Sequence, residues 1–396
     1  MNNIKEDIYS KYISELNDLK ESDSFRSFIT HAERDKKYIY INGKKYLNLS
    51  SNDYLGLSSD RELINEFYSK MKCGKGFHQE FMLGSSSSRS LTADSVIHNE
   101  LETELSQLYH NEVLLFNSGY HANIGIIPAV TTREDLILTD KLNHASIIDG
   151  SRLSFAKCLK YDHLNYENLE DFLKRHRDRY KNVIIVSESL FSMNGDIADI
   201  KKLVELKQKY NCLLYIDEAH SAGVFGTDGL GICKENDIIK EIDFVVVTFG
   251  KAFGSYGAFV VTKKVFKEYL INKMRSLIFT TALPPVIINW SLFIIRKIAD
   301  FKDRREKLFA LSKEFRQLFE NEGLDIRGSS YIIPVIIGKN DGTLKMSKIL
   351  KENGFYCMPI RPPTVPDGSA RIRISLTSEI DLDDIRRIPK IIKENL

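Results

Sequence analysis

The chain has 396 residues, of which 43% are hydrophobic and 28% are charged, and its formal net charge at pH 7 is +2. These values are typical of a globular protein, and the length predicts two domains or one large domain with an annex. Because the charge is nearly balanced, the composition gives no indication of a polyanionic partner and argues against nucleic-acid binding.

The cysteines, the N-terminal residues and the most apolar segment bear on the cellular compartment of the protein. The five cysteines are odd in number and contain no CxxC pair, which argues against a disulfide framework or a metal site. They are Cys73, Cys158, Cys212, Cys233 and Cys357. Residues 1–16 are polar and charged, unlike a secretory signal, so we expect a cytoplasmic protein. Residues 281–301 contain Pro284, Asn289 and Arg296, and therefore predict a buried helix and no membrane span.

The predicted elements begin with an amphipathic helix over residues 4–19. Asn42-Gly43, between alternating apolar residues, then predicts a β-hairpin within residues 37–51. From about residue 92, helical patterns alternate with short apolar runs, which predicts a mostly parallel sheet covered by helices on both faces. The runs are VLLF, LILT, NVIIVSES, CLLYID, DFVVVTF and AFVVT.

The pattern changes after about residue 283. Two long helical patterns lead into YIIPVIIG, a further helix, FYCMPI, ARIRISL and a last helix. This order predicts a smaller α+β domain at the C-terminus. We therefore expect an N-terminal segment at 1–50, a large domain at 51–282 and a small domain at 283–396.

Polar residues follow several of the predicted strands. In a parallel sheet, working residues collect beyond the carboxyl ends of the strands. The residues at these ends are Ser118-Gly119-Tyr120, Glu188, Ser192, Asp217, His220, Thr248 and Lys251. Each could by itself be a helix cap, a turn or a surface residue. Their combination at one edge of a sheet indicates a site.

A nucleotide site is the first alternative, because LLYIDEAH has the form of a helicase-type acidic box. That chemistry also needs a phosphate loop of the form GxxxxGK[ST]. Gly250-Lys251 is the only Gly-Lys pair at a strand end, but Ala252 follows it and Val245 stands where the first glycine is required. The sequence therefore argues against an NTPase.

Pyridoxal 5′-phosphate (PLP) is the second alternative, and it accounts for more of these residues. PLP needs a lysine for a Schiff base and an acidic partner for its ring nitrogen, and Lys251 and Asp217 provide them. An ionised Asp217 would favour the protonated ring, which then withdraws electrons from the substrate. Once released from the Schiff base, Lys251 could act as a base.

The remaining contacts of such a cofactor can also be assigned. Ser118, Gly119 and Tyr120 precede a helix, where backbone N–H groups bind anions, so they form a phosphate cradle together with Thr248. Two histidines complete the set. His144, in DKLNHASIIDG, could stack on the ring, and His220 could bond its phenolic oxygen.

With these residues in place, the chain resembles the α-oxoamine synthases, a branch of the fold-type-I PLP-dependent transferases. The resemblance covers nearly the whole chain, and its blocks occur in the order found in the family. The blocks are LNLSSNDYLGL at 47–57, DEAHSAGVFGTDGLG at 217–231, TFGKAFGSYGAF at 248–259 and RPPTVPDGSARIRISLT at 361–377. The last block is most similar to the branch that condenses L-alanine with a pimeloyl thioester of CoA or a carrier protein.

The resemblance implies further roles. Arg373, with Asn52, would hold the amino-acid carboxylate, for which the planar fork of arginine is suited. Ser192 and His220 would bond the cofactor, and Arg26 matches a position near the acyl donor. Arg361 belongs to the RPPTVP block that marks the branch.

The resemblance also implies a homodimer and marks one departure from the family. Thr280 and Thr281 match residues that reach the phosphate in the neighbouring subunit, which places the site at a two-fold interface. The departure is GSSSSR at residues 84–89, where the family usually has GSGGSR. This segment normally lies near the substrate, so the replacement concerns the acyl pocket and not the cofactor residues.

Two other functions stay open at this point. The first is a sibling synthase that uses glycine or serine with another acyl-CoA, since each methylene of an acyl chain contributes only about 1–3 kcal/mol of discrimination. The second is a non-catalytic scaffold that keeps the fold. The presence of both Lys251 and Asp217 argues against the scaffold.

Overall fold

The computed structural model describes residues 2–30, 33–70 and 80–396, so Cys73 and most of the segment before GSSSSR lie outside the described residues. Cα packing divides the chain into two units, each described here by itself. The first consists of residues 1–51, 193–195 and 309–396, and the second of residues 52–192 and 196–308.

The larger unit contains a seven-stranded sheet in the order β4-β10-β9-β8-β7-β5-β6. Its strands are β4 (Glu112–Phe116), β5 (Leu136–Asp140), β6 (Lys157–Tyr161), β7 (Val183–Glu188), β8 (Leu213–Asp217), β9 (Phe244–Thr248) and β10 (Ala258–Thr262). β10 runs antiparallel to both of its neighbours, whereas β6, β5, β7, β8 and β9 pair in parallel. The predicted mostly parallel sheet is therefore confirmed.

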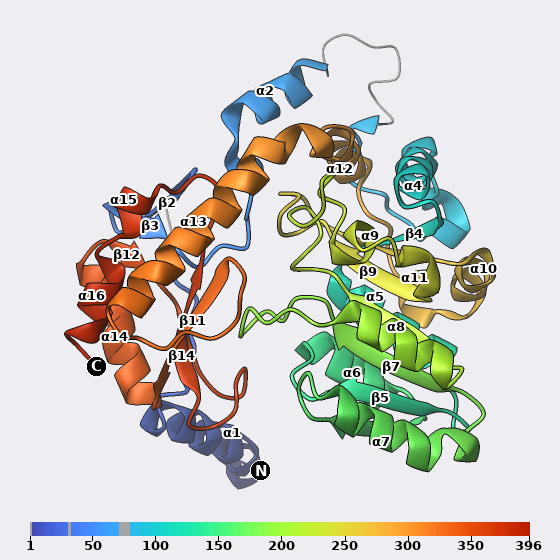
Figure 1. Cartoon of the computed structure of the whole chain (residues 1–396), viewed down its shortest axis with the longest axis horizontal. Coiled ribbons are helices and arrows are strands. Elements are labelled where there is room, and N and C mark those ends of the chain that lie inside the picture. The colour runs from blue at the N-terminus through green and yellow to red at the C-terminus, as the bar shows by residue number, and fades with distance from the viewer. Residues whose placement is uncertain (1, 31–32, 71–79) are drawn as a thin grey trace. The chain divides into compact units, whose positions relative to one another are not determined.

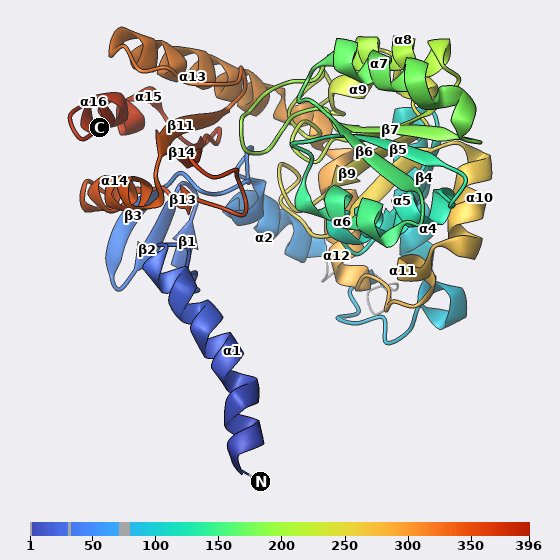
Figure 2. The same cartoon turned by 90° about the horizontal axis from the view of Figure 1, so that it is seen from below.

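Helices cover both faces of this sheet (Figure 2). α5 and α6 pack together on one face, where α10 and α11 also contact α5, and α7 and α8 pack together on the other face. The helices of this unit are α2 (Arg61–Lys70), α4 (Val96–Tyr109), α5 (Gly119–Val130), α6 (Ala145–Leu153), α7 (Tyr166–His176), α8 (Ile200–Lys209), α9 (Ile232–Glu235), α10 (Lys264–Lys273), α11 (Arg275–Ile278) and α12 (Pro285–Arg296).

Burial of apolar side chains holds the sheet and helices together. β7, β8 and β9 are buried on both faces, which explains their continuous apolar runs. Ile126 and Ile127 of α5 pack in one cluster with Ile184 of β7 and Val246 of β9. All four are at most 1% exposed, so this cluster fixes the start of α5 beside the strand ends.

The smaller unit contains two sheets, in the orders β1-β2-β3-β12 and β11-β14-β13 (Figure 1). Its strands are β1 (Glu33–Asp35), β2 (Tyr38–Ile41), β3 (Lys44–Asn48), β11 (Ile332–Gly338), β12 (Phe355–Tyr356), β13 (Pro359–Ile360) and β14 (Ala370–Ser375). Its helices are α1 (Asn2–Glu21), α14 (Asn340–Glu352), α15 (Leu382–Ile385) and α16 (Ile388–Lys393), and α13 (Lys302–Asn321) runs from the larger unit into it.

Two local predictions are confirmed. β2 and β3 form the expected hairpin, and Asn42 and Gly43 turn it with φ of 51° and 73°. Both residues tolerate this left-handed backbone, which two-residue hairpin turns need. The apolar segment at 281–301 contains α12, whose Ile288, Leu292 and Ile294 are buried.

The observed division at 51/52 lies one residue from the predicted boundary at 50/51, whereas the predicted boundary at 282/283 differs from the observed one at 308/309. α12 packs on α4 and so belongs to the larger unit, and the boundary falls within α13. The N-terminal residues join the smaller unit because β3 pairs with β12 in parallel, with Leu47 opposite Phe355. A boundary set by pairing between distant segments leaves no local signal in the sequence.

Within residues 2–30, 33–70 and 80–396, no helix combines the length and the apolar character needed to cross a bilayer.

Candidate cofactor site

A pocket of about 200 Å³ opens at the carboxyl ends of the parallel strands in the larger unit. It is lined by eight of the residues assigned to the cofactor: Ser118, Gly119, Tyr120, His144, Asp217, His220, Thr248 and Lys251. Asp217 and Lys251 thus share one cavity, as the PLP hypothesis requires. Asn123, Ser146, Glu188 and Tyr256 also line it.

Lys251 lies in the turn between β9 and β10. The amide of Phe249 donates to Gly257 O at 2.9 Å, and the amide of Gly254 donates to Lys251 O at 2.9 Å. Ala252 and Phe253 beside it are 1% and 0% exposed. The backbone and its buried neighbours therefore fix the position of Lys251, which lines the pocket.

Asp217 ends β8 and is 5% exposed. Its Oδ1 accepts a hydrogen bond from Ala219 N at 2.8 Å, and its Oδ2 accepts one from Asn123 Nδ2 at 2.8 Å. Asn123 is in turn held by Tyr215, whose hydroxyl donates to its Oδ1 at 2.5 Å. These two donors hold the carboxylate in place where it lines the pocket.

The start of α5 has the properties of a phosphate cradle. Ser118 caps the helix, and its Oγ accepts from His121 N at 3.2 Å, which places the next amides at the positive end of the helix. A Cβ on Gly119 would lie 2.4 Å from Thr248 Cγ2, so only glycine fits there. In the described part of the chain, the buried Oγ1 of Thr248 has no hydrogen-bond partner. A ligand oxygen would satisfy it.

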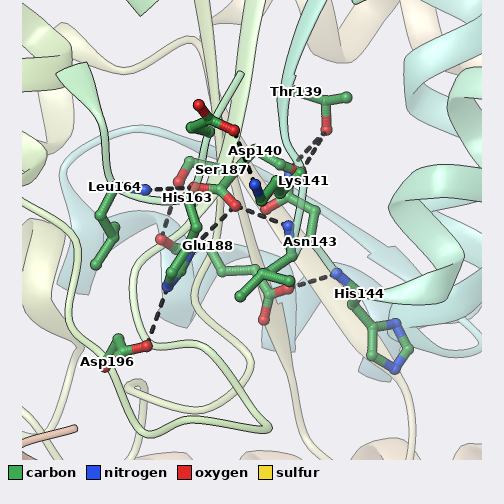
Figure 3. A network of polar contacts seen from close by, with 12 residues as sticks. Thr139, Asp140, Lys141, Asn143, His144, His163, Leu164, Ser187, Glu188 and Asp196 are labelled. Atoms are coloured by element: carbon green, nitrogen blue, oxygen red, sulfur yellow. Dashed lines mark hydrogen bonds and ion pairs between the residues drawn. The ribbon is translucent and has the colours of Figure 1, made fainter. Parts of the chain in front are cut away.

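His144 lies on another side of the pocket, as the N-cap of α6. Its amide donates to Glu188 Oε1 at 2.5 Å (Figure 3). Its Nδ1 lies 2.7 Å from Ser146 Oγ. Burial lowers the pKa of His144 below its ordinary value of 6.5, although the nearby Asp217 opposes this effect. The ring is therefore neutral at pH 7, which suits stacking on a cationic cofactor ring.

Glu188 is buried beneath this site. Burial, together with the charge of Asp217, raises the pKa of Glu188 well above its ordinary value of 4.5.

His220 Nδ1 lies 2.7 Å from the hydroxyl of Tyr54, which also donates to Asn52 Oδ1 at 3.2 Å. Asn52 is thus linked to a residue that lines the pocket.

The other predicted residues lie outside the lining of this pocket. Ser192 is 7% exposed and follows β7. Asn117 Nδ2 contacts Thr280 Oγ1 at 3.3 Å and Thr281 O at 2.8 Å. In the smaller unit, Arg373 on β14 donates to Ser375 Oγ at 2.7 Å.

Arg26 and Arg361 line a separate cavity of about 640 Å³ in the smaller unit. Arg26 donates to Pro362 O and to Thr364 Oγ1, both at 3.2 Å.

The serine-rich segment contacts the chain before α12. Ser85 Oγ donates to Leu283 O at 2.6 Å, and Ala282 N donates to Ser87 O at 2.9 Å. Ser86 has a φ of 52°, a left-handed conformation that favours the glycine usual in the family.

Asn123 is the functional residue that the sequence reasoning missed. It lies four residues after Gly119 and therefore on the same face of α5. The phosphate-cradle prediction, extended by one helical turn, could have found it. Its partner, Asp217, is 94 residues away in sequence, which no spacing rule connects.

Replacement of Thr248 by valine tests the cradle. We expect cofactor affinity to fall about 10–100-fold, the effect of losing one hydrogen bond to a charged group. The thermal stability of the cofactor-free protein should stay the same or rise, because the lost hydroxyl has no partner among the described residues. Cofactor titration and thermal melting measure both quantities. Thr262→Val is the matched control, since Thr262 Oγ1 donates to Asp243 O at 2.6 Å and its loss should reduce stability alone.

Comparison with known proteins identifies the family to which the chain belongs. The family model of class I and II aminotransferases matches residues 44–391, so the chain belongs to that family. The fold is that of the fold-type-I PLP-dependent transferases, which confirms the predicted fold class.

Two relatives of known name are similar over most of the chain. An 8-amino-7-oxononanoate synthase from Chlorobaculum parvum is 44% identical over 368 residues, which cover 93% of this chain and 94% of that protein. A putative 8-amino-7-oxononanoate synthase from Glaesserella parasuis is 50% identical over 306 residues, 76% of this chain and 80% of that protein.

Two solved structures of known enzymes have a fold similar to that of this chain. A serine palmitoyltransferase from S. paucimobilis, with a bound PLP–myriocin aldimine, superposes with a TM-score of 0.88 at 27% identity, over 98% of this chain and 97% of that one. An 8-amino-7-oxononanoate synthase from Francisella tularensis superposes with a TM-score of 0.73 at 29% identity, over 88% of this chain and 97% of that one.

Proposed function

We propose that this protein is a PLP-dependent C-acyltransferase that makes 8-amino-7-oxononanoate in biotin biosynthesis. The reaction joins L-alanine to a pimeloyl thioester and releases CO₂ and the free thiol. The observation that carries the proposal is the pocket in which Asp217 and Lys251 meet, in a chain 44% identical to such a synthase over 93% of its length.

The residues of the pocket fit PLP. When bound, the cofactor supplies an electrophilic aldehyde carbon and a cationic ring that withdraws electrons from the substrate. Asp217 would hold the proton on the ring nitrogen, and Thr248 with the start of α5 would hold the phosphate. His144 would cover one face of the ring. Lys251 would hold the aldehyde carbon, and its amine would move the proton of the substrate α-carbon.

The remaining roles stay with the residues that the resemblance indicates. Arg373 and Asn52 would bind the amino-acid carboxylate, and Arg26 and Arg361 would act on the acyl donor. His220 and Ser192 would bond the phenolic oxygen of PLP. Thr280 and Thr281 would approach the phosphate of a second copy in a homodimer. We place the protein in the cytoplasm, because the four described cysteines are free thiols.

A substrate panel tests the function. L-Alanine, glycine and L-serine would each be combined with acetyl-, succinyl-, pimeloyl- or palmitoyl-CoA, or with a pimeloyl carrier protein, while thiol and CO₂ release are followed together. We expect turnover with L-alanine and a pimeloyl donor. Turnover with L-serine and palmitoyl-CoA would support the second candidate, a palmitoyltransferase, which the TM-score of 0.88 favours. Turnover with glycine and a short donor would also contradict the proposal.

A further inference from the structure

His163 lies outside the pocket, in the loop between β6 and α7, and its ring is held between two carboxylates (Figure 3). Nδ1 lies 2.9 Å from Asp140 Oδ1 and 3.1 Å from Asp140 Oδ2, and Nε2 lies 3.0 Å from Asp196 Oδ2. The ring also packs edge-on against Phe191, with 4.4 Å between centroids. Since an ionised carboxylate only accepts hydrogen bonds, both ring nitrogens must donate, and the ring is an imidazolium.

Asp140, the first of these carboxylates, organises the turn that carries His144. It ends β5, its side chain is fully buried, and it accepts hydrogen bonds from Leu142 N at 2.8 Å and Leu164 N at 3.0 Å. Asn143, the residue after Leu142, donates to Val186 O at 2.9 Å. The turn therefore connects Asp140, the partner of His163, to His144, which lines the pocket.

Asp196, the second carboxylate, closes the loop that carries Ser192. The amide of Phe191 donates to Asp196 O at 2.9 Å, and Leu190 forms a bridge with Ile197. Phe191, which contacts the His163 ring, immediately precedes Ser192. One side chain thus contacts the last residue of β5 and the loop that follows its parallel neighbour β7.

The surroundings favour the positive charge. Burial opposes it, but the hydrogen bonds to Asp140 and Asp196 outweigh burial and raise the pKa of His163 from 6.5 to about 9. The other titratable groups nearby are Tyr161, Tyr166, Lys141, Asp162 and Glu188. Lys141 is paired with Asp162 at 2.8 Å, and the raised pKa values of Tyr161 and Tyr166 keep both phenols neutral near pH 7. Burial raises the pKa of Glu188 well above its ordinary value.

We propose that His163 is a positioning residue of the cofactor site, whose positive charge ties the turn of His144 to the loop of Ser192 from behind the pocket. Among the described residues, His163 is the cation that contacts Asp140, so the loss of its charge would leave a buried carboxylate without one, which is costly. The turn would then relax, and His144 would lose its fixed place over the cofactor ring. The inference rests on the proposed PLP site and is independent of the acyl donor.

The direction of the pH effect follows from the raised pKa. Because the pKa of His163 in the folded protein lies above 6.5, its contribution is complete below about pH 6.5 and is lost as pH rises through about 9. Cofactor affinity in the wild-type protein should therefore fall through a step near pH 9. A residue that only fills space would produce no such step.

The test compares PLP dissociation constants between pH 7 and 10 for the wild type and three variants. His163→Gln should weaken PLP binding about 10-fold at pH 7.5, the loss of one charged hydrogen bond, and remove the step. Asp196→Asn removes one carboxylate and should move the step to lower pH. His176→Gln is the matched control, because His176 on α7 stacks on Phe172 and should leave the profile unchanged.

An independent readout is the imidazole resonance of His163 in protein labelled at histidine, identified by its loss in His163→Gln. We expect it to titrate near pH 9, and a midpoint near 6.5 would overturn the inference. A His163→Gln variant that melts at a lower temperature but keeps the wild-type pH step would also overturn it. If the wild-type protein did not bind PLP, the proposed function would fail, which is a separate outcome.

Discussion

Lys251→Ala is expected to lower kcat by at least about 10⁴-fold, the largest effect of any single substitution in the chain. The variant loses both the covalent attachment of the cofactor and the group that moves the α-proton, and proton transfer alone contributes about 10²–10⁴-fold. Thiol and CO₂ release with L-alanine and a pimeloyl thioester would be measured at saturating substrate.

The fold of this variant should be preserved. The turn around Lys251 is held by backbone hydrogen bonds and by the buried Ala252 and Phe253, so truncation of the lysine side chain removes little packing. Borohydride reduction followed by peptide mass analysis should find cofactor attached to Lys251 in the wild type and at no lysine in the variant.

Lys264→Ala is the matched control for this experiment. Lys264 begins α10 just after β10, and its side chain is 78% exposed. The control should keep the full rate and the covalent cofactor. A Lys251→Ala protein within tenfold of the wild-type rate would contradict the enzyme assignment and restore the scaffold hypothesis.

Asp217→Ala is expected to lower kcat by about 10²–10⁴-fold and to weaken cofactor binding. The carboxylate is the negative group that the pocket offers to the ring nitrogen, and without it the ring loses its proton and most of its electron-withdrawing power. The absorbance spectrum of the bound cofactor and the steady-state rate would both be recorded. The change also leaves Asn123 Nδ2 and Ala219 N without this acceptor, so some stability is lost.

A modified cofactor separates the chemical effect from the structural one. A PLP analogue methylated at the ring nitrogen carries a fixed positive charge and needs no carboxylate to maintain it. We expect it to restore at least about tenfold of the rate lost in Asp217→Ala, a difference of about 1.4 kcal/mol in the barrier. Failure of the analogue to raise the rate above that with PLP would contradict the proposed role.

Asp243→Asn is the structural control for Asp217. Asp243 is also a buried carboxylate beside β9, where it accepts a hydrogen bond from Leu214 N at 2.9 Å and contacts Lys263 at 3.2 Å. It lies at the amino end of the strand, away from the pocket. This control should lower the melting temperature and leave kcat per folded molecule unchanged.

Local structure and the residues of the candidate site could be predicted from the sequence. Strand and helix periodicity predicted the sheet and its covering helices, because burial on both faces demands continuous apolar runs. Asn42-Gly43 predicted the hairpin because few residues adopt its backbone angles. Lys251 and Asp217 were predictable because a charged residue directly after a buried strand must be paired or used. Eight of the residues assigned to the cofactor therefore line one pocket.

Only the tertiary structure decided which distant residues contact one another. The antiparallel β10 lies between β4 and β9, the N-terminal residues pair with β12, and Asn123 supports Asp217. The contacts of His163 could not be predicted from the sequence either. Its two partners, Asp140 at the end of β5 and Asp196 in the loop after β7, belong to other strands, and local periodicity carries no information about them. These contacts depend on strand order and on the packing of helices against the sheet, which arise from the whole chain.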